Sequence, residues 1–127
     1  MKIEQLYTPD LACCYLDDSL VTAAERMRHA EISALAVIDE NGELVGIISE
    51  RDLVRALGDV IDPDDVTVAA YATDNVALAA PEDDTAEIEA RMLDAGIRHM
   101  PVVSEGRLVG MVSMRDLLAG RQRTSTT

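Results

Sequence analysis

Apolar and polar positions follow an order that occurs twice along the chain. Apolar residues at helical spacing come first, then a short apolar run, a turn, a second apolar run and a second helical segment. In the first copy, Val21, Ala24 and Met27 form the predicted buried stripe of the opening helix, and Asp18 or Ser19 is its N-cap. The pattern predicts a duplicated helix–strand–strand–helix unit.

The opening helix of the second copy carries the clearer start signal. Asp84 is the predicted N-cap, and Glu87 three residues later completes a capping box. The stripe that faces the core is then Ile88, Met92 and Ala95.

A pair of buried strands follows each opening helix. The dipeptide Asn41-Gly42 is a hairpin signal in the first copy. The closing helices are expected to stop at Gly58 and Gly120, because glycine is common where helices end. The predicted ranges are 35–38 and 44–48 for the first pair of strands, 100–103 and 108–112 for the second, and 51–57 and 115–119 for the closing helices.

The two copies define the domain organisation. Positions 42–54 and 106–118 agree at 8 of 13 places. The expected fold class is α+β (α/β), with two repeats related by a pseudo-twofold axis, each a small mixed sheet packed with two helices. The predicted boundaries are repeat 1 at 1–58, an acidic linker at 59–65, repeat 2 at 66–120 with a possible short helix at 66–71, and a polar tail at 121–127.

Composition narrows the function classes. The chain has 127 residues, 48% of them apolar, three Tyr and no Trp or Phe, and a net charge of −13. This charge disfavours binding to DNA or RNA, so any phosphate ligand must meet a local group of cations. The sequence shows no signal peptide or membrane span, and the adjacent thiols of Cys13 and Cys14 suit a reducing compartment. We therefore expect a cytoplasmic protein.

Three segments resemble the CBS domain, the family named for cystathionine β-synthase. They are Leu44–Leu53, Leu108–Leu117 and the first-strand segment Gly96–Val103. The resemblance covers roughly Leu6 to Gly120 and implies a tandem CBS pair, or Bateman module. Such pairs commonly form homodimers, and they bind adenosine-containing ligands such as AMP, ADP, ATP or S-adenosylmethionine. The resemblance thus implies a regulatory, energy-sensing module that signals to a separate effector protein.

The resemblance also implies two ligand sites, each combining the Ser-x-x-Asp motif of one repeat with the first strand of the other. Site A consists of Ser49, Arg51, Asp52, Thr73, Val76, Arg98, His99, Met100 and Pro101. Site B, the weaker candidate, consists of Thr8, Leu11, Ser33, Ala34, Leu35, Ser113, Arg115 and Asp116.

The residue types suit a nucleotide. One carboxylate accepts both vicinal ribose hydroxyls, a role that fits Asp52 or Asp116. Apolar walls for an adenine come from Val76, Met100 and Val112. Only site A has a cationic pair for phosphate, Arg98 and His99, and as neighbours in a strand they point to opposite faces. Site B has Ser33 and Ala34 at the matching places, and copy one has Glu31 and Ala36 where copy two has Gly96 and Pro101.

Other interpretations remain open. Ser-x-x-Asp before an apolar run is also a helix capping box, which would explain both motifs without a ligand. The chain could then be a structural or protein-interaction module. A third hypothesis is a thiol switch at Cys13 and Cys14. We expect no catalytic residues and no metal site, because neither a nucleophile motif nor metal-ligand spacing occurs.

Overall fold

The structure is a computed structural model that describes residues 1–7, 13–59, 61–74 and 76–125, with side chains up to residue 120. The chain divides into two compact units. Unit 1 comprises Met1–Leu11 and Ala77–Thr127, and unit 2 comprises Ala12–Val76. Helices and small sheets build both units, so the predicted α+β class is confirmed.

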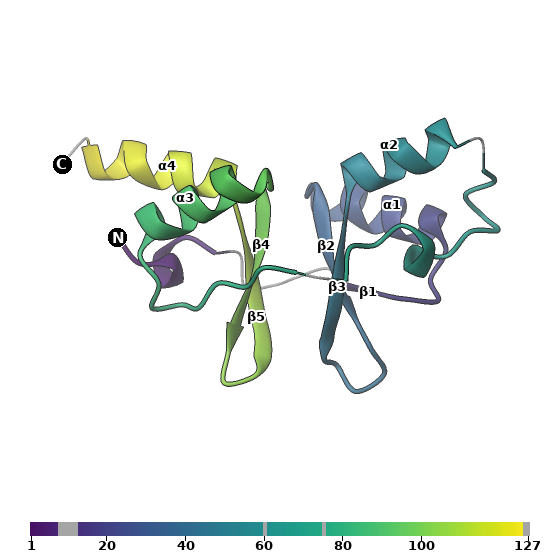
Figure 1. Cartoon of the computed structure of the whole chain (residues 1–127), viewed down its shortest axis with the longest axis horizontal. Helices are drawn as coiled ribbons and strands as arrows, with labels where there is room; N and C mark the ends of the chain where they lie inside the picture. The colour runs from purple at the N-terminus through teal and green to yellow at the C-terminus, as the bar shows by residue number, and fades with distance from the viewer. Residues whose placement is uncertain (8–12, 60, 75, 126–127) are drawn as a thin grey trace. The chain divides into compact units, whose positions relative to one another are not determined.

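Unit 2 contains a three-stranded sheet covered by two helices on one side (Figure 1). Strand β1 runs parallel to β2, and β2 runs antiparallel to β3. The elements are β1 (Cys13–Tyr15), α1 (Leu20–Ala30), β2 (Ala34–Ile38), β3 (Leu44–Ser49), α2 (Glu50–Gly58) and the 3-10 helix η2 (Val68–Ala70).

Unit 1 repeats this plan with one strand fewer. Its sheet is the antiparallel pair β4–β5, and α3 and α4 lie on one side of it (Figure 1). The elements are the 3-10 helix η1 (Ile3–Gln5), α3 (Thr85–Ala95), β4 (His99–Ser104), β5 (Arg107–Ser113) and α4 (Met114–Ser125).

The opening helix of unit 2 buries a different stripe from the predicted one. Ser19 is the N-cap, and its hydroxyl accepts a hydrogen bond from the Thr22 backbone N–H at 3.1 Å. The buried residues are Leu20, Ala23 and Met27. The prediction of Val21 and Ala24 was therefore wrong, because the core face begins at the first helical residue. Val21 and Ala24 lie on the neighbouring, more exposed side.

The opening helix of unit 1 departs from its prediction at both ends. Asp84 is the N-cap, but its side chain makes no cap hydrogen bond, so the predicted capping box with Glu87 is wrong. Its carboxylate lies 3.7 Å from the amino group of Met1 instead. Ile88 and Met92 are buried as predicted, whereas Ala95 is exposed at the last residue of the helix.

The two hairpins use different turns. In unit 1, Glu105 and Gly106 both have positive φ, which is the requirement of a two-residue type I′ turn. In unit 2 the hairpin at Asn41-Gly42 is confirmed, but only Gly42 has positive φ there. The Asp39 carboxylate holds this longer turn, because it accepts from the backbone N–H groups of Asn41 and Glu43, each at 2.9 Å.

The last helix does not stop at Gly120. It continues to Ser125. A Cβ at Gly120 would lie 2.8 Å from both methyl carbons of Leu6. This glycine therefore serves a close approach between α4 and the N-terminal segment, not a helix end.

The segment that precedes the opening helix of each repeat, its leading segment, packs on the unit formed by the other repeat. Ile3 is fully buried in the core of unit 1, and its backbone N–H donates to Asp83 O at 2.9 Å. Val68, 65 positions later, is fully buried in the core of unit 2, and its N–H donates to Asp18 O at 2.8 Å. Both cores are thus completed by a segment from outside the helix–strand–strand–helix unit.

Candidate functional site

The junction of β3 and α2 holds the Ser-x-x-Asp motif of the first repeat. The Asp52 Oδ2 accepts from the Ser49 backbone N–H at 2.8 Å and from the Ser49 hydroxyl at 3.1 Å. The Asp52 backbone N–H points back to the Ser49 Oγ at 3.4 Å. The predicted capping box is therefore present, and it leaves Oδ1 as the less occupied oxygen of the carboxylate.

Asp52 is unusually buried for a carboxylate. Its exposed fraction is 7%, and it is the one charged residue in the core among those the structure describes. The Arg55 guanidinium lies 3.6 Å from Oδ1. Burial of a charge is costly without partners, and the serine and arginine donors offset that cost.

Arg55 also ties α2 to the segment that follows it. It donates to the Tyr71 carbonyl at 3.1 Å and lies 5.5 Å from the centre of the Tyr71 ring. The Tyr71 hydroxyl donates to the Asp59 carboxylate at 2.7 Å, and this bond raises the pKa of the tyrosine. Sequence reasoning missed Arg55, and only its position three residues after Asp52 could have indicated it.

Thr73 lies beside β3, the strand that leads to Ser49. The family resemblance had assigned Thr73 to the same site as Ser49 and Asp52. Ile47 and Thr73 exchange two backbone hydrogen bonds of 2.9 Å each. A Cβ at Gly46 would lie 2.7 Å from the Thr73 carbonyl oxygen, so only glycine permits this approach. Unit 2 thus brings exposed Thr73 to the strand that ends at Ser49.

The second repeat carries a similar but simpler junction at β5 and α4. The Asp116 Oδ2 accepts from the Ser113 N–H at 2.9 Å, and the Asp116 N–H donates to the Ser113 Oγ at 3.0 Å. Asp116 is half-buried, and Arg115 is exposed. This repeat has Ala119 at the position of Arg55, so the guanidinium contact has no counterpart.

The start of each first strand lies next to the motif of its own repeat. His99 pairs with Ser113 across the hairpin, and Arg98 O accepts from Met114 N at 2.8 Å. Ala34 pairs with Ser49 in the same way, and Ser33 O accepts from Glu50 N at 2.9 Å. Arg98 is exposed and His99 is half-buried.

Several residues predicted to contact a ligand are buried. Met100 and Val112 are fully buried in the core of unit 1, and Leu35 is fully buried in the core of unit 2. Ala34 and Pro101 are also buried. These side chains pack in the cores, so their contact with a ligand stays a prediction.

The structure groups the predicted residues by unit. Unit 2 also holds two further members of site A, exposed Arg51 and half-buried Val76. Thr8 and Leu11 of site B lie outside the described residues. The combination of the two repeats into sites A and B stays a prediction.

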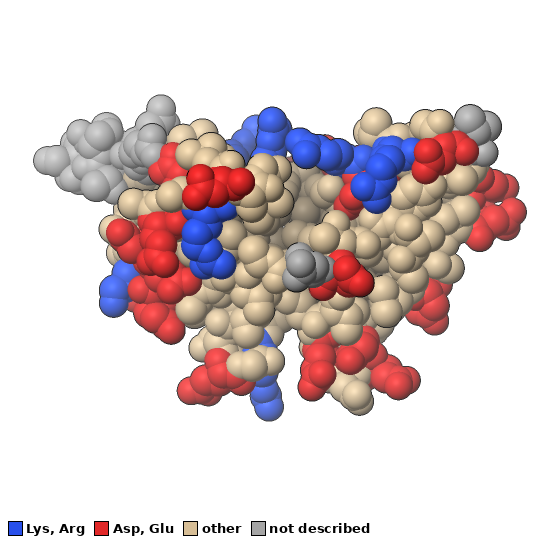
Figure 2. Space-filling view, viewed as in Figure 1, with Lys and Arg blue, Asp and Glu red and all other residues tan. Residues whose placement is uncertain are grey.

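Each of the two motifs has an exposed arginine beside it, although the chain as a whole is acidic. Figure 2 shows Asp and Glu side chains over much of the visible surface, with fewer Lys and Arg. Unpaired backbone N–H groups at a helix start attract negative charge. Here Ser49 and Ser113 precede α2 and α4, and Arg51 and Arg115 are exposed in their first turns.

The two cysteines are poorly suited to a thiol switch. Burial raises the pKa of Cys14 to about 12, and burial also raises the pKa of Cys13. A protonated thiol is a weak nucleophile. Cys14 is fully buried in the core of unit 2, which supports a packing role.

The chain belongs to the CBS-domain family. The family description "CBS domain" matches it twice, at residues 3–59 and 68–122. The predicted tandem pair is confirmed, and pairs of CBS domains are regulatory modules.

Relatives and solved structures support this membership. An uncharacterised protein of Methanocaldococcus jannaschii is 34% identical over 96 residues, which are 76% of this chain and 34% of that protein. The chain therefore spans about a third of the length of this relative. A CBS-domain containing protein from Agrobacterium tumefaciens has 30% identity and a TM-score of 0.88, over 94% of this chain and 92% of that one.

One similar structure contains ligands. The CBS domain pair of protein MJ0100, in complex with 5′-methylthioadenosine and S-adenosyl-L-methionine, has 25% identity and a TM-score of 0.88. The match covers 100% of this chain and 98% of that one. Both ligands of that protein contain an adenosine group.

Two further kinds of site were searched for among the described residues. No group of three or more His, Cys, Asp and Glu side chains there could hold a metal ion. No helix in the same part of the chain is long and apolar enough to cross a membrane.

Proposed function

We propose that this chain is a cytoplasmic sensor that binds an adenosine-containing ligand, AMP, ADP or ATP, and transmits its occupancy to a separate effector protein. S-adenosylmethionine is an alternative ligand of the same class. The chain carries out no catalysis itself. As the family resemblance implies, two copies associate into a homodimer.

One observation carries the proposal. Both repeats present a serine and an aspartate at a helix start, with the aspartate held in place by a capping box. A carboxylate fixed in this way is ready to accept the two hydroxyls of a ribose. The adenosine ligands of the MJ0100 pair support the ligand class.

Site A is the stronger candidate for a phosphate-bearing ligand. As the family resemblance implies, site A includes Asp52, Arg98 and His99, whereas site B has Ser33 and Ala34 in place of Arg98 and His99. Exposed Arg98 supplies the cation that a phosphate needs on a chain of net charge −13. Site B would suit an uncharged adenosine group.

The test is a thermal-shift panel with AMP, ADP, ATP, S-adenosylmethionine, NAD and GTP. A ligand at a hundred times its Kd adds about 2.7 kcal/mol to the free energy of unfolding, a shift of several degrees. Each variant is compared with its own ligand-free Tm. Asp52→Asn is the site A variant, because the amide keeps most of the cap, and Asp116→Asn is its matched control.

The outcomes separate the hypotheses. A shift in the wild type that Asp52→Asn removes and Asp116→Asn keeps supports the sensor and site A. The reverse result assigns the ligand to site B. If no ligand of the panel shifts the Tm, the sensor proposal fails and the interaction-module hypothesis takes its place.

A further inference from the structure

Arg55 lies beside the Asp52 carboxylate without forming a hydrogen bond to it. The Arg55 Nη2 is 3.6 Å from Asp52 Oδ1, which is an ion-pair distance but too long for a hydrogen bond. The same nitrogen donates to the Tyr71 carbonyl at 3.1 Å. The guanidinium therefore offsets the charge of the carboxylate and leaves the lone pairs of Oδ1 free to accept other donors.

The other oxygen of this carboxylate is already occupied. Asp52 Oδ2 accepts from both the backbone N–H and the hydroxyl of Ser49, and these two donors use its two lone pairs. The hydroxyls of a ribose must therefore approach Oδ1 or displace the Ser49 hydroxyl. The free acceptor capacity of Asp52 thus lies at the oxygen that is paired with Arg55.

Tyr71 holds Arg55 in this position. The guanidinium carbon lies 5.5 Å from the centre of the Tyr71 ring, within the range of a cation–π contact. The Tyr71 hydroxyl is itself anchored, because it donates to the Asp59 carboxylate at 2.7 Å. The ring and the carbonyl of Tyr71 together keep the guanidinium from a direct hydrogen bond with Asp52.

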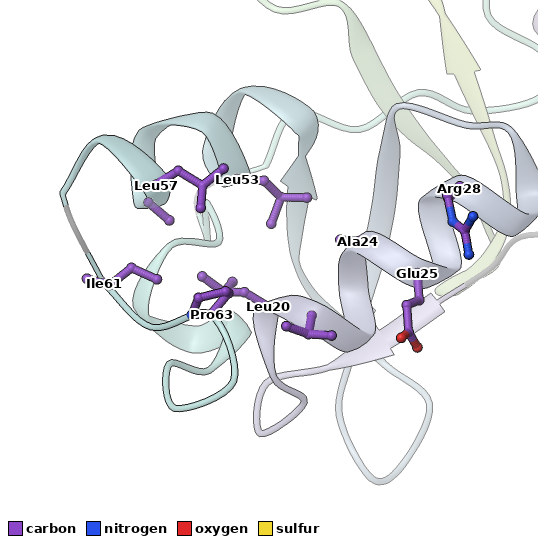
Figure 3. A pocket seen from close by; sticks show the side chains of 10 residues that line it. Leu20, Ala24, Glu25, Arg28, Leu53, Leu57, Ile61 and Pro63 are labelled. Atoms are coloured by element: carbon purple, nitrogen blue, oxygen red, sulfur yellow. The ribbon is translucent and has the colours of Figure 1, made fainter.

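Apolar contacts on another side of α2 hold the helix itself in place. Leu53 and Leu57 face an apolar groove between α1 and α2, which Leu20 and Pro63 also line (Figure 3). Arg55 is not one of the groove residues, and its side chain is 59% exposed. An ion pair with one partner so exposed contributes little to stability. Stability alone therefore does not explain the arginine.

The second repeat lacks this arrangement. It has Ala119 at the position of Arg55, and its counterpart of Tyr71 is Leu6, 65 positions earlier in the chain. The side chain of Leu6 lies against Gly120 in the last helix. The seam between the closing helix and the leading segment is therefore apolar in unit 1 and charged in unit 2.

We propose that Arg55 is a specificity-determining residue of the Asp52 site, because it lets one carboxylate bind ribose hydroxyls while a phosphate is bound nearby. This inference rests on the proposed function. An uncompensated carboxylate would repel the phosphate of a nucleotide, above all on a chain of net charge −13. Arg55 removes this repulsion, from which an uncharged nucleoside gains little. The site therefore selects phosphorylated adenosine ligands over adenosine.

The test compares AMP with adenosine, two probes that share the ribose and differ in the phosphate. Isothermal titration calorimetry on the full chain measures both dissociation constants. Arg55→Met keeps the aliphatic stem and removes the charge, so it should weaken AMP binding about tenfold and change adenosine binding by less than about threefold. A displaced helix or carboxylate would weaken both ligands equally. The ratio of the two constants thus separates a charge effect from a structural one.

Two further variants serve as controls. Arg55→Lys keeps the charge and should keep AMP binding within about threefold of the wild type. Arg107→Met makes the same change in net charge at the exposed first residue of β5, which belongs to neither candidate site, and should leave both constants unchanged. Raising the salt concentration from about 0.05 M to about 0.5 M should reduce the AMP loss of Arg55→Met, because salt screens charge. Circular dichroism checks that all variants fold.

The results distinguish this inference from the proposed function. A wild type that binds no ligand of the thermal-shift panel overturns both. A wild type that binds another ligand of the panel but not AMP overturns this inference alone, and so does AMP binding that Asp52→Asn leaves intact. Equal changes for AMP and adenosine in Arg55→Met, or no change, also overturn it. A selective loss of AMP binding that Arg55→Lys restores supports it.

Discussion

The two units are copies of one pattern, yet they differ where the first strand meets its neighbours. In unit 2, Ala36 lies between Cys13 of β1 and Ile47 of β3, in a sheet of three strands. Unit 1 has Pro101 at this place, and its third strand is reduced to a single bridge between Ala79 and Val102. Proline lacks a backbone N–H, so it cannot donate to a second neighbour.

Alanine and proline at this position thus accompany parallel ladders of different length. Pro101 can still accept a hydrogen bond through its carbonyl oxygen. In the bridge of unit 1, the Ala79 N–H donates to this oxygen at 2.9 Å. The Val103 N–H closes the bridge by donating to Ala79 O, also at 2.9 Å. The parallel pairing in unit 1 thus keeps these two hydrogen bonds and has no donor at Pro101.

Exchanging these two residues should give the largest effect. Ala36→Pro places proline in a fully buried central strand and should cost about 3 kcal/mol or more. Pro101→Ala should cost only about 1 kcal/mol, mainly through a freer unfolded chain. Urea unfolding followed by circular dichroism measures both. Equal costs would show that the Ala36 N–H does not matter to the sheet.

The two aspartates of the Ser-x-x-Asp motifs should differ by a smaller amount. Asp52 is 7% exposed and accepts from two groups of Ser49, with Arg55 nearby, whereas Asp116 is half-buried and accepts from the Ser113 N–H. Asp52→Ala should lower the free energy of unfolding by about 2 kcal/mol and Asp116→Ala by about 1 kcal/mol. Chemical unfolding of the ligand-free variants provides the measurement. A larger loss for Asp116→Ala would contradict the comparison.

The smallest expected effects concern the ends of the opening helices. Both C-caps are left-handed, with φ of 55° at Glu31 and 67° at Gly96. Glu31→Gly should stabilise the protein by about 0.5 kcal/mol, and Gly96→Ala should destabilise it by about 1 kcal/mol. Nothing lies within 4 Å of a Cβ at Gly96, so the destabilisation by Gly96→Ala comes from the backbone conformation alone. Opposite signs in thermal unfolding are the expected result.

Much of this architecture could be predicted from the sequence. The repeat, both hairpins and the helix starts at Ser49 and Ser113 follow from turn residues, capping residues and apolar runs, which are local signals. The stripe of α1 was misplaced by one residue, because Leu20, Val21, Ala23 and Ala24 are all apolar and periodicity alone could not choose between them.

Contacts between distant segments were harder to predict. Gly120 was read as a helix end because its real reason, the approach of Leu6, lies more than a hundred positions away in the sequence. The contact of Arg55 with Tyr71 was missed because the segment between them carries no periodic signal. The hydrogen bonds of the two Ser-x-x-Asp motifs could be predicted, whereas the arginine beside Asp52 could not. The ligand-site residues stay a prediction.

The exchange of leading segments has a consequence for whether the chain can be divided into two folded fragments. Ile3 completes the core that contains Ile88 and Met92, and Val68 completes the core that contains Leu20 and Met27. A chain cut within the linker would give two fragments. The first would contain Ile3, which the core of unit 1 needs, and the second would contain Val68, which the core of unit 2 needs. Neither half should be a self-sufficient protein, but the two should reassemble when mixed. The two repeats are therefore alike in pattern, but each should depend on the other for one residue of its core.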